Sequence, residues 1–471
     1  MYRYALISLF LLVLLTPFAL RWAVGTKAGA GAGRDRLTLV VMTPHQEMIR
    51  REFADAFSDW HRQHHGEGVF IDYRSYGAAD IVKYFEAARE PIYQKFGTYK
   101  VDVVWGGGDY LFDAQLKKPG YLQTVDLGAD FLAAVFPRPD VAGVDLYDRK
   151  DHAWFGTALS GFGVVFNRDV ARHLAIPEPT TWRDLADPRW DGWIVLADPT
   201  RSSSAKMAYM IIIERAMVDA AAQGRTEDDG WADGMGLVRQ IAASARQFVD
   251  GGSVPAITVS KGEAGAGMAI DFFARSQVDA VGSRRMGYVE PPNATAINPD
   301  PIALVKGAPQ RELAIRFIRF VLSDEGQRLW NTRAGAPGGP RATSLRRLPV
   351  RQSAYADMSH FTDPVNPFEM AGGFNKSSER EKTFGIIGEL IQYSCIDLLE
   401  ELRATRRAIL ASPRAAELDA KLGRFPFDQK EALRRLAAWK SANAATKLQL
   451  GRQWTAQFRQ EYRLLRQEAA R

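Results

Sequence analysis

The order of short apolar runs and helix-like segments constrains the fold of this chain most strongly. Apolar runs at residues 37–42, 69–73 and 101–105 have the length and composition of buried strands. Segments at residues 47–60 and 79–88 separate these runs and carry apolar residues near helical spacing. Because strands joined through helices lie parallel in one sheet, this order predicts an open, largely parallel α/β sheet.

The same alternation begins again after residue 154. We expect strands at residues 162–166, 192–196 and 267–270, with a helix at residues 205–216 between the last two. The chain therefore contains two α/β units. Open α/β sheets bind ligands at the carboxyl ends of their strands, so the two units predict a ligand crevice.

The first residues carry the features of an export signal. Arg3 precedes an apolar run at residues 5–20, and Ala28-Gly29-Ala30 offers a cleavage site. We assign residues 1–30 to a signal peptide, or to an N-terminal anchor if cleavage does not occur, and expect the rest of the chain to lie outside the cytoplasm. The single cysteine, Cys395, excludes an internal disulfide framework.

Positive charge is concentrated near the C-terminus, where the pattern is helical from residue 393 onward. The formal net charge is +6, but residues 403–471 hold sixteen Lys or Arg against six Asp or Glu, so the preceding part is net negative. The basic residues are spread through a helical pattern with no aromatic platform beside them, which is typical of a solvated helix surface. We expect no nucleic-acid partner.

Hydroxyl side chains gather where the predicted strand at residues 192–196 gives way to a helix. Thr200, Ser202, Ser203 and Ser204 fall within five positions. The first N–H groups of a helix lack partners and carry the positive end of its dipole, so hydroxyls beside them can bind an anion. One serine would be enough to cap the helix, which is the alternative interpretation.

The sequence carries none of the catalytic motifs that we sought. It has no GxSxG nucleophile motif, no P-loop, no HExxH and no Cys–His ligand set, so we expect no catalytic residue, no cofactor and no resident metal. A hydrolase or transferase on the same fold could use Asp109, Asp198 or Asp271, but nothing in the sequence activates a partner beside them.

Several motifs follow one another in a distinctive order. They are Val101-Asp-Val-Val-Trp105 with three following glycines, Leu159-Ser-Gly-Phe-Gly-Val-Val-Phe-Asn167, Ala197-Asp-Pro-Thr200 with Ser202 and Ser203, Gly267-Met-Ala-Ile-Asp-Phe-Phe273, Asn298-Pro-Asp-Pro-Ile-Ala303 and Phe320-Val-Leu-Ser-Asp-Glu-Gly-Gln327. Through these motifs, residues 37–330 resemble the extracellular solute-binding proteins of ABC importers, in the branch that includes ferric-iron and phosphonate binders. The resemblance covers the segment after residue 343 poorly, and the tail from about residue 403 not at all.

The resemblance implies an α/β fold of two lobes, the type II periplasmic-binding fold. Each lobe is an open mixed sheet flanked by helices, and a hinge joins the two. It places the first part of lobe 1 at residues 37–157, lobe 2 at 158–283 and a return to lobe 1 at 284–345. We expect residues 346–402 to pack on the lobes and residues 403–471 to form an added, basic helical extension.

Receptors of this kind bind their ligand between the lobes, and the resemblance assigns the ligand contacts to loops of both lobes. The matching residues are Thr43, His45, Gly107, Gly108, Asp109, Ser160, Thr200, Ser202, Ser203, Asp271 and Phe272.

One difference from the family bears on the ligand. Ferric-iron members place adjacent tyrosines near the positions of Phe272 and Phe273. A phenyl ring supplies no oxygen to a hard cation, so the difference favours an organic anion such as a phosphonate, a phosphate ester or a carboxylate. Iron remains the alternative, because His45 lies in the first loop, where some iron binders have histidine.

The resemblance therefore implies a monomeric periplasmic receptor that captures a small solute by lobe closure. Such a receptor delivers its solute to an ABC permease in the inner membrane. A ferric-iron receptor and a membrane-tethered sensory or assembly partner on the same fold are the alternative functions.

Overall fold

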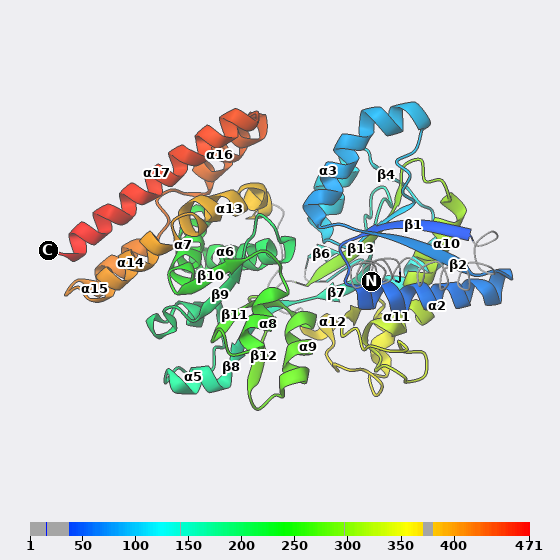
Figure 1. Cartoon of the computed structure of the whole chain (residues 1–471), viewed down its shortest axis with the longest axis horizontal. Helices are drawn as coiled ribbons and strands as arrows, with labels where there is room; N and C mark the ends of the chain where they lie inside the picture. The colour runs from blue at the N-terminus through cyan, green and yellow to red at the C-terminus, as the bar shows by residue number, and fades with distance from the viewer. Residues whose placement is uncertain (1–15, 17–36, 142, 296, 371–379) are drawn as a thin grey trace, which may run out of the picture.

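The computed structural model describes residues 16, 37–141, 143–295, 297–370 and 380–471. Two α/β halves lie side by side, and the last helices of the chain extend along the outer side of the second half (Figure 1). The predicted signal peptide or anchor at residues 1–30 falls outside the described residues, except for Thr16. In the described part of the chain, no helix has both the length and the apolar character needed to span a membrane.

The first half is built on a seven-stranded sheet with the order β14-β7-β13-β3-β1-β2 and with β4 paired to β13. β1 runs parallel to β2 and β3, whereas β13 runs antiparallel to β3, β4 and β7. The strands are β1 (Leu37–Thr43), β2 (Val69–Ser75), β3 (Val103–Trp105), β4 (Leu122–Gln123), β7 (Phe155–Ser160), β13 (Asn298–Val305) and β14 (Leu348–Pro349).

Helices cover both faces of this sheet, which explains why β1 is almost entirely apolar. Leu39 packs with α2 (Glu47–His65) and α10 (Arg311–Leu322) on one face. Met42 packs with α3 (Ala78–Ala88) on the other face. Consecutive residues of a strand point to opposite faces, so an apolar run is needed where both faces are buried.

The second half contains a five-stranded sheet with the order β10-β9-β11-β8-β12. α6 (Ser203–Ala222) and α7 (Glu227–Ala242) pack on one face, and α8 (Val254–Ser260) and α9 (Asp271–Val281) pack on the other. The strands are β8 (Phe162–Asn167), β9 (Ile194–Ala197), β10 (Ala245–Val249), β11 (Ala266–Ile270) and β12 (Met286–Val289).

The chain passes between the halves at the ends of the long central strands. The step from β7 to β8 is made at Gly161, and the chain returns to the first half between the end of β12 at Val289 and the start of β13 at Asn298. β12 is the antiparallel neighbour of β8, so the chain remains part of the second sheet until Val289. The predicted second lobe ended earlier, at residue 283.

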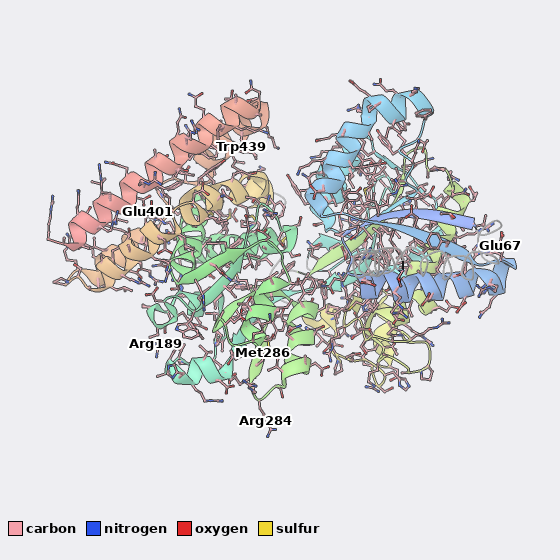
Figure 2. The ribbon with its side chains drawn as sticks, in the orientation of Figure 1. Glu67, Arg189, Arg284, Met286, Glu401 and Trp439 are labelled. Atoms are coloured by element: carbon pink, nitrogen blue, oxygen red, sulfur yellow. The ribbon has the colours of Figure 1, made fainter. Side chains whose placement is uncertain are left out.

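The C-terminal helices are packed into the second half. Arg239 of α7 is buried and donates to the backbone oxygen of Leu422, while Arg406 is buried and donates to the backbone oxygens of Gln240 and Ala186. The core of the second half continues without a break into these helices, and Trp439 marks one of them in Figure 2. The predicted helical C-terminal region is confirmed. The helices are η6 (Arg380–Thr383), α13 (Phe384–Ile391), η7 (Gln392–Ile396), α14 (Leu399–Leu410), α15 (Ala415–Leu422), α16 (Gln429–Ser441) and α17 (Ala444–Ala469).

Shorter elements complete the two halves. They are η1 (Arg89–Gln94), η2 (Leu111–Lys117), α4 (Ala129–Val135), β5 (Asp140–Val141), β6 (Val144–Asp145), α5 (Arg168–His173), η3 (Trp182–Ala186), η4 (Pro188–Trp190), α11 (Asp324–Asn331), η5 (Gln352–Ala356) and α12 (Pro367–Met370).

Candidate functional site

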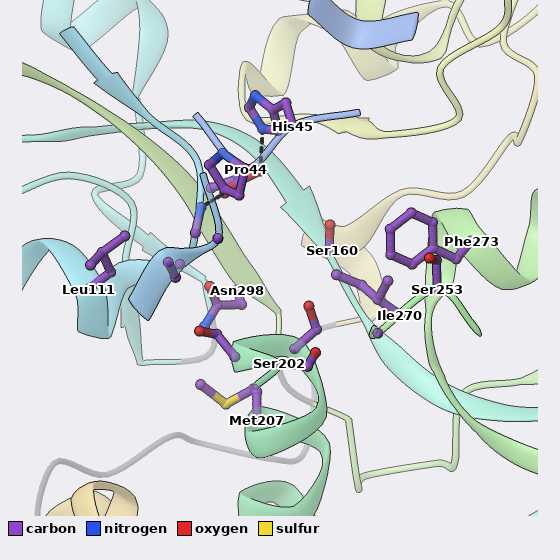
Figure 3. Close-up of a pocket in the computed structure, with 18 of the residues that line it drawn as sticks. Pro44, His45, Leu111, Ser160, Ser202, Met207, Ser253, Ile270, Phe273 and Asn298 are labelled. Carbon is purple, nitrogen blue, oxygen red and sulfur yellow. Dashed lines mark hydrogen bonds and ion pairs between the residues drawn. The ribbon is translucent and has the colours of Figure 1, made fainter. Parts of the chain in front are cut away.

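A cleft of about 390 Å³ lies between the two halves, where loops from both sheets meet (Figure 3). The first half contributes the loops that follow β1, β2 and β3, and the second half contributes those that follow β9, β10 and β11. A cleft at the carboxyl ends of the strands is the usual ligand site of an open α/β sheet. Among its lining residues are Pro44, His45, Gly107, Gly108, Asp109, Leu111, Ser160, Ser202, Ser203, Ser204, Met207, Phe272, Phe273 and Asn298.

Helix N-termini from both halves converge on this cleft. The N-cap residues of α2, α3, α6, α8 and α9 are Gln46, Gly77, Ser202, Ser253 and Ile270, and all of them line the cleft. Of these caps, only Ser202 accepts a side-chain capping bond from its own helix. The positive ends of the helix dipoles therefore point toward one volume, which favours a negatively charged ligand.

The loop before α6 holds the predicted hydroxyl residues. Ser202 Oγ accepts from the backbone N–H of Ala205 at 3.2 Å, so this serine is the helix cap. Ser203 and Ser204 also line the cleft, and Ser203 is exposed there. Thr200 does not line the cleft, because its hydroxyl donates to Asp198 Oδ1 at 2.7 Å within the preceding turn. One hydroxyl of the cluster therefore caps the helix, and two more face the cleft.

A buried ion pair forms the floor of the cleft. Arg347 Nη1 donates to Asp300 Oδ2 at 2.6 Å, and Arg347 Nη2 donates to Ser160 Oγ at 2.9 Å. Asp300 Oδ1 accepts from the backbone N–H of Gly107 at 2.7 Å. The guanidinium carbon of Arg347 lies 4.5 Å from the centre of the Phe272 ring, so this residue joins the first half to the second. Arg347 thus fixes the positions of several predicted site residues at once.

Burial and ion pairing determine the charge states of Asp300 and His45 at the floor of the cleft. Burial alone would raise the pKa of Asp300, but the positive charge of Arg347 holds that pKa well below its usual range. Burial lowers the pKa of His45 and outweighs the opposing effect of Asp300, so the imidazole is neutral at neutral pH. His45 Nε2 lies 2.8 Å from Asp300 Oδ2, which can only accept, so Nε2 carries the ring proton.

Two further predicted residues lie behind the surface of the cleft. Thr43 is buried at the end of β1, and its Oγ1 accepts from the backbone N–H of His45 at 3.1 Å. Asp271 is buried at the start of α9, where it accepts from the backbone N–H of Phe272 at 2.7 Å. Both residues position a neighbour that lines the cleft. Asp109 does line it, and its Oδ1 accepts from Asn298 Nδ2 at 3.1 Å.

Several cleft residues were missed by the sequence analysis. Asp300 and Asn298 belong to a motif that was noticed only as part of a family pattern, and Gly251-Gly252 follows β10 as Gly107-Gly108 follows β3. Arg347 and Phe384 come from the part of the chain that the family resemblance covers poorly. Only the glycine pair carried a local signal that could have revealed it, namely small residues directly after a strand.

Metal-binding groups are not clustered in the described part of the chain. Among the described residues, no group of three His, Cys, Asp or Glu side chains is arranged to hold a metal ion. At the position where ferric-iron binders have tyrosines, the rings of Phe272 and Phe273 pack at a centroid distance of 4.2 Å. Phe273 lines the cleft with an apolar face.

A ligand-sized cleft between two α/β halves, with helix N-termini reaching it from both, defines a two-lobed solute-binding protein. Residues 101–353, more than half of the chain, match the family described as bacterial extracellular solute-binding protein. The chain belongs to this family, and the predicted resemblance is confirmed.

Curated relatives align with part of the chain. It is 28% identical over 175 residues to the phosphoglycerate transport regulatory protein PgtC of Salmonella typhimurium, across 36% of this chain and 39% of that protein. It is 25% identical over 186 residues to iron uptake protein A1 of Synechocystis, across 38% of this chain and 47% of that protein. The matches therefore span less than half the length of these relatives.

A solved structure supports the fold. The periplasmic binding protein AfuA of Actinobacillus pleuropneumoniae, with exogenous fructose-6-phosphate bound, superposes with a TM-score of 0.54 at 20% sequence identity. The superposition covers 77% of this chain and 99% of AfuA. The predicted two-lobed α/β fold is confirmed, and nearly a quarter of this chain has no counterpart in AfuA.

Proposed function

We propose that this chain is the substrate-binding receptor of an ABC importer and that it captures a small organic anion between its two lobes. The observation that carries the proposal is the convergence of five helix N-termini, from both lobes, on one cleft. An anion placed there gains from dipoles of both lobes only when the lobes are closed, so binding and closure are coupled. A volume of about 390 Å³ suits a small molecule rather than a peptide.

A phosphate ester is the ligand class that we favour. Ser203, Ser204 and the glycines after β10 can donate to phosphate oxygens, while Phe273 and Met207 offer apolar contact to a carbon skeleton. PgtC is named for phosphoglycerate transport, and the AfuA structure contains fructose-6-phosphate; both compounds are phosphate esters. Phosphonates and carboxylates have the same charge and acceptor groups and remain within the proposed class.

The receptor would act as a periplasmic monomer, either free or tethered by its N-terminal segment, and would deliver its ligand to a permease in the inner membrane. By the sheets to which they contribute, lobe 1 would comprise residues 37–160 and 298–345, and lobe 2 residues 162–289. No chemical step is part of the proposal. Asp300, the carboxylate at the floor of the cleft, is held as an anion by Arg347 and is a poor general acid.

Ferric iron is the second candidate ligand, because iron uptake protein A1 is among the relatives. Iron(III) prefers anionic oxygen ligands, and the phenyl rings of Phe272 and Phe273 supply none. His45 is the residue for which iron remained the alternative ligand. Its Nε2 is hydrogen-bonded to Asp300, and its side chain is only 4% exposed. These contacts favour the organic anion.

Isothermal titration calorimetry tests the proposal. The purified protein would be titrated with fructose 6-phosphate, 3-phosphoglycerate, unphosphorylated fructose, ferric citrate and citrate alone. We expect one-to-one binding of at least one phosphate ester and no binding of fructose. Binding of ferric citrate, but of neither citrate alone nor either ester, would replace the proposal with the iron alternative.

A serine variant connects the binding to this cleft. Ser203→Ala removes one hydroxyl beside the α6 N-terminus, so we expect the affinity for the phosphate ester to fall roughly 10-fold or more, as for the loss of a hydrogen bond to a charged group. The matched control is Ser441→Ala, which changes an exposed serine on α16, away from the cleft. Equal affinities for the two variants would show that the ester binds elsewhere.

A further inference from the structure

One wall of the cleft comes from the C-terminal helices. Phe384, the first residue of α13, lines the cleft and is only 5% exposed. It lies beyond residues 101–353, the part of the chain that matches the family. A segment outside the matched residues therefore reaches the ligand site.

Phe384 is held firmly by the second lobe. The residue before it, Thr383, is buried and its Oγ1 accepts from Trp231 Nε1 of α7 at 3.0 Å. Lys206 Nζ, in the first turn of α6, lies 5.6 Å from the centre of the Phe384 ring. Phe384 is also part of the apolar core that joins α6 and α7 to the C-terminal helices. The ring is therefore fixed beside the same helix start that carries Ser202, Ser203 and Ser204.

Across the cleft, Phe384 meets the first lobe at Tyr110. The centres of the two rings lie 4.6 Å apart at an interplanar angle of 53°. A side chain at Gly385 would place its Cβ 3.3 Å from Tyr110 Oη, which shows how closely α13 approaches this tyrosine. Tyr110 packs against the core of the second lobe although it belongs to the first. It directly follows Gly107, Gly108 and Asp109, the loop proposed to contact the ligand.

We propose that the C-terminal helices complete the ligand cleft: Phe384 of α13 and Tyr110 of the first lobe form a latch that holds the two lobes together beside the ligand. The inference rests on the proposed closure of two lobes around a solute. An aromatic pair contributes enough to shift the ratio of closed to open molecules roughly 2- to 12-fold. The latch joins the lobes on the side of the cleft where α3 and α13 face each other, whereas the chain crossings join them at β7 and β13 (Figure 1).

The test is a distance measurement that needs no ligand. Spin labels at Glu86→Cys on α3 and Lys440→Cys on α16, both exposed, report the separation of the lobes by pulsed electron resonance. The native Cys395 is buried and does not compete for the label. In the ligand-free protein, we expect Phe384→Ala and Tyr110→Ala each to move the distance distribution toward longer values. Since the two rings share one contact, the double variant should shift it no further than either single variant.

Two controls separate a latch from a general loss of packing. Tyr110→Phe keeps the ring and should keep the original distribution. Leu465→Ala removes a buried apolar side chain from α17, away from Phe384, and should also leave the distance unchanged. If Phe384→Ala does not fold, Phe384→Leu and Tyr110→Ala decide the question.

Unchanged distance distributions in the ring-removing variants would overturn the latch. This outcome is distinguishable from failure of the proposed function, which is judged separately by titrating the unmodified protein with fructose 6-phosphate. A shift in the distances of a protein that binds no phosphate ester would support the latch and reject phosphate esters as the ligand.

Discussion

At the scale of single residues, Arg347 organises the binding site. It pairs with Asp300, bonds Ser160 and lies over the Phe272 ring, so three parts of the cleft depend on one side chain. No sequence pattern marked it, because it contacts residues that are distant along the chain. Ser203 was predictable for the opposite reason, because it lies where a strand gives way to a helix. His45 and Gly107 were expected at the cleft through the family resemblance.

Replacement of Arg347 should destabilise the protein. Arg347→Met leaves the buried Asp300 carboxylate without its cation, and we expect the free energy of unfolding to fall by about 3–5 kcal/mol in urea denaturation. Arg347→Lys keeps the charge but lacks the fork that reaches both Asp300 and Ser160, so its loss should be smaller. Equal stability of the Met variant and the unmodified protein would contradict the assigned ion pair.

At the scale of elements, the hinge contains a buried carboxylate. A side chain on Gly161, between β7 and β8, would place its Cβ 2.6 Å from Glu290 Oε2, which follows β12, so the two crossings touch. Arg275 of α9 donates to Glu290 Oε1 at 2.7 Å. Burial and the nearby charge of Asp271 raise the pKa of Glu290 from 4.5 to about 7 in spite of this partner.

The raised pKa predicts a pH dependence of stability. Between pH 4.5 and 7 the folded protein holds a proton on Glu290 that the unfolded chain has released, so the stability contributed by this group falls as pH rises through this window. Glu290→Gln should remove that slope in urea denaturation measured across the same pH range. Glu312→Gln, at an exposed carboxylate on α10, is the control and should keep it. A Glu290→Gln profile with an unaltered slope would assign the titration to another group.

The C-terminal helices are a second element whose role the sequence concealed. Their helical pattern and basic faces were predictable from composition, whereas their attachment depends on Arg239 and Arg406, which contact carbonyls far along the chain. Hydrogen bonds from arginine to backbone oxygens leave no pattern in a sequence. The position of Phe384 could not be predicted either, because only the packing of the helices brings it to the cleft.

Arg239 should anchor these helices measurably. Arg239→Met removes the donors to the backbone oxygens of Leu422 and Arg424 and to Glu461, so we expect a loss of at least about 2 kcal/mol in the free energy of unfolding. Arg463→Met on α17, where the exposed side chain donates to the exposed Gln460, should change it by less than about 0.5 kcal/mol. Similar values for both variants would mean that Arg239 does not anchor the helices.

At the scale of the whole molecule, the alternation of strands and helices predicted two α/β units, and the motifs predicted how they join. The sequence could not predict that the C-terminal helices share a core with lobe 2, because a continuous apolar cluster depends on which helix faces meet. The resulting molecule has two lobes joined at crossing strands, a cleft between them and C-terminal helices that reach the cleft at Phe384.

Native mass spectrometry of the freshly purified protein tests the central claim most directly. A receptor that holds a small anion by closure should retain some of its ligand, so we predict a fraction of molecules carrying one small organic anion, released unchanged on denaturation. Ser203→Ala should carry less of it, while Ser441→Ala should carry the same amount. Iron in place of an organic anion, or recovery of a chemically altered ligand after prolonged incubation, would contradict the account.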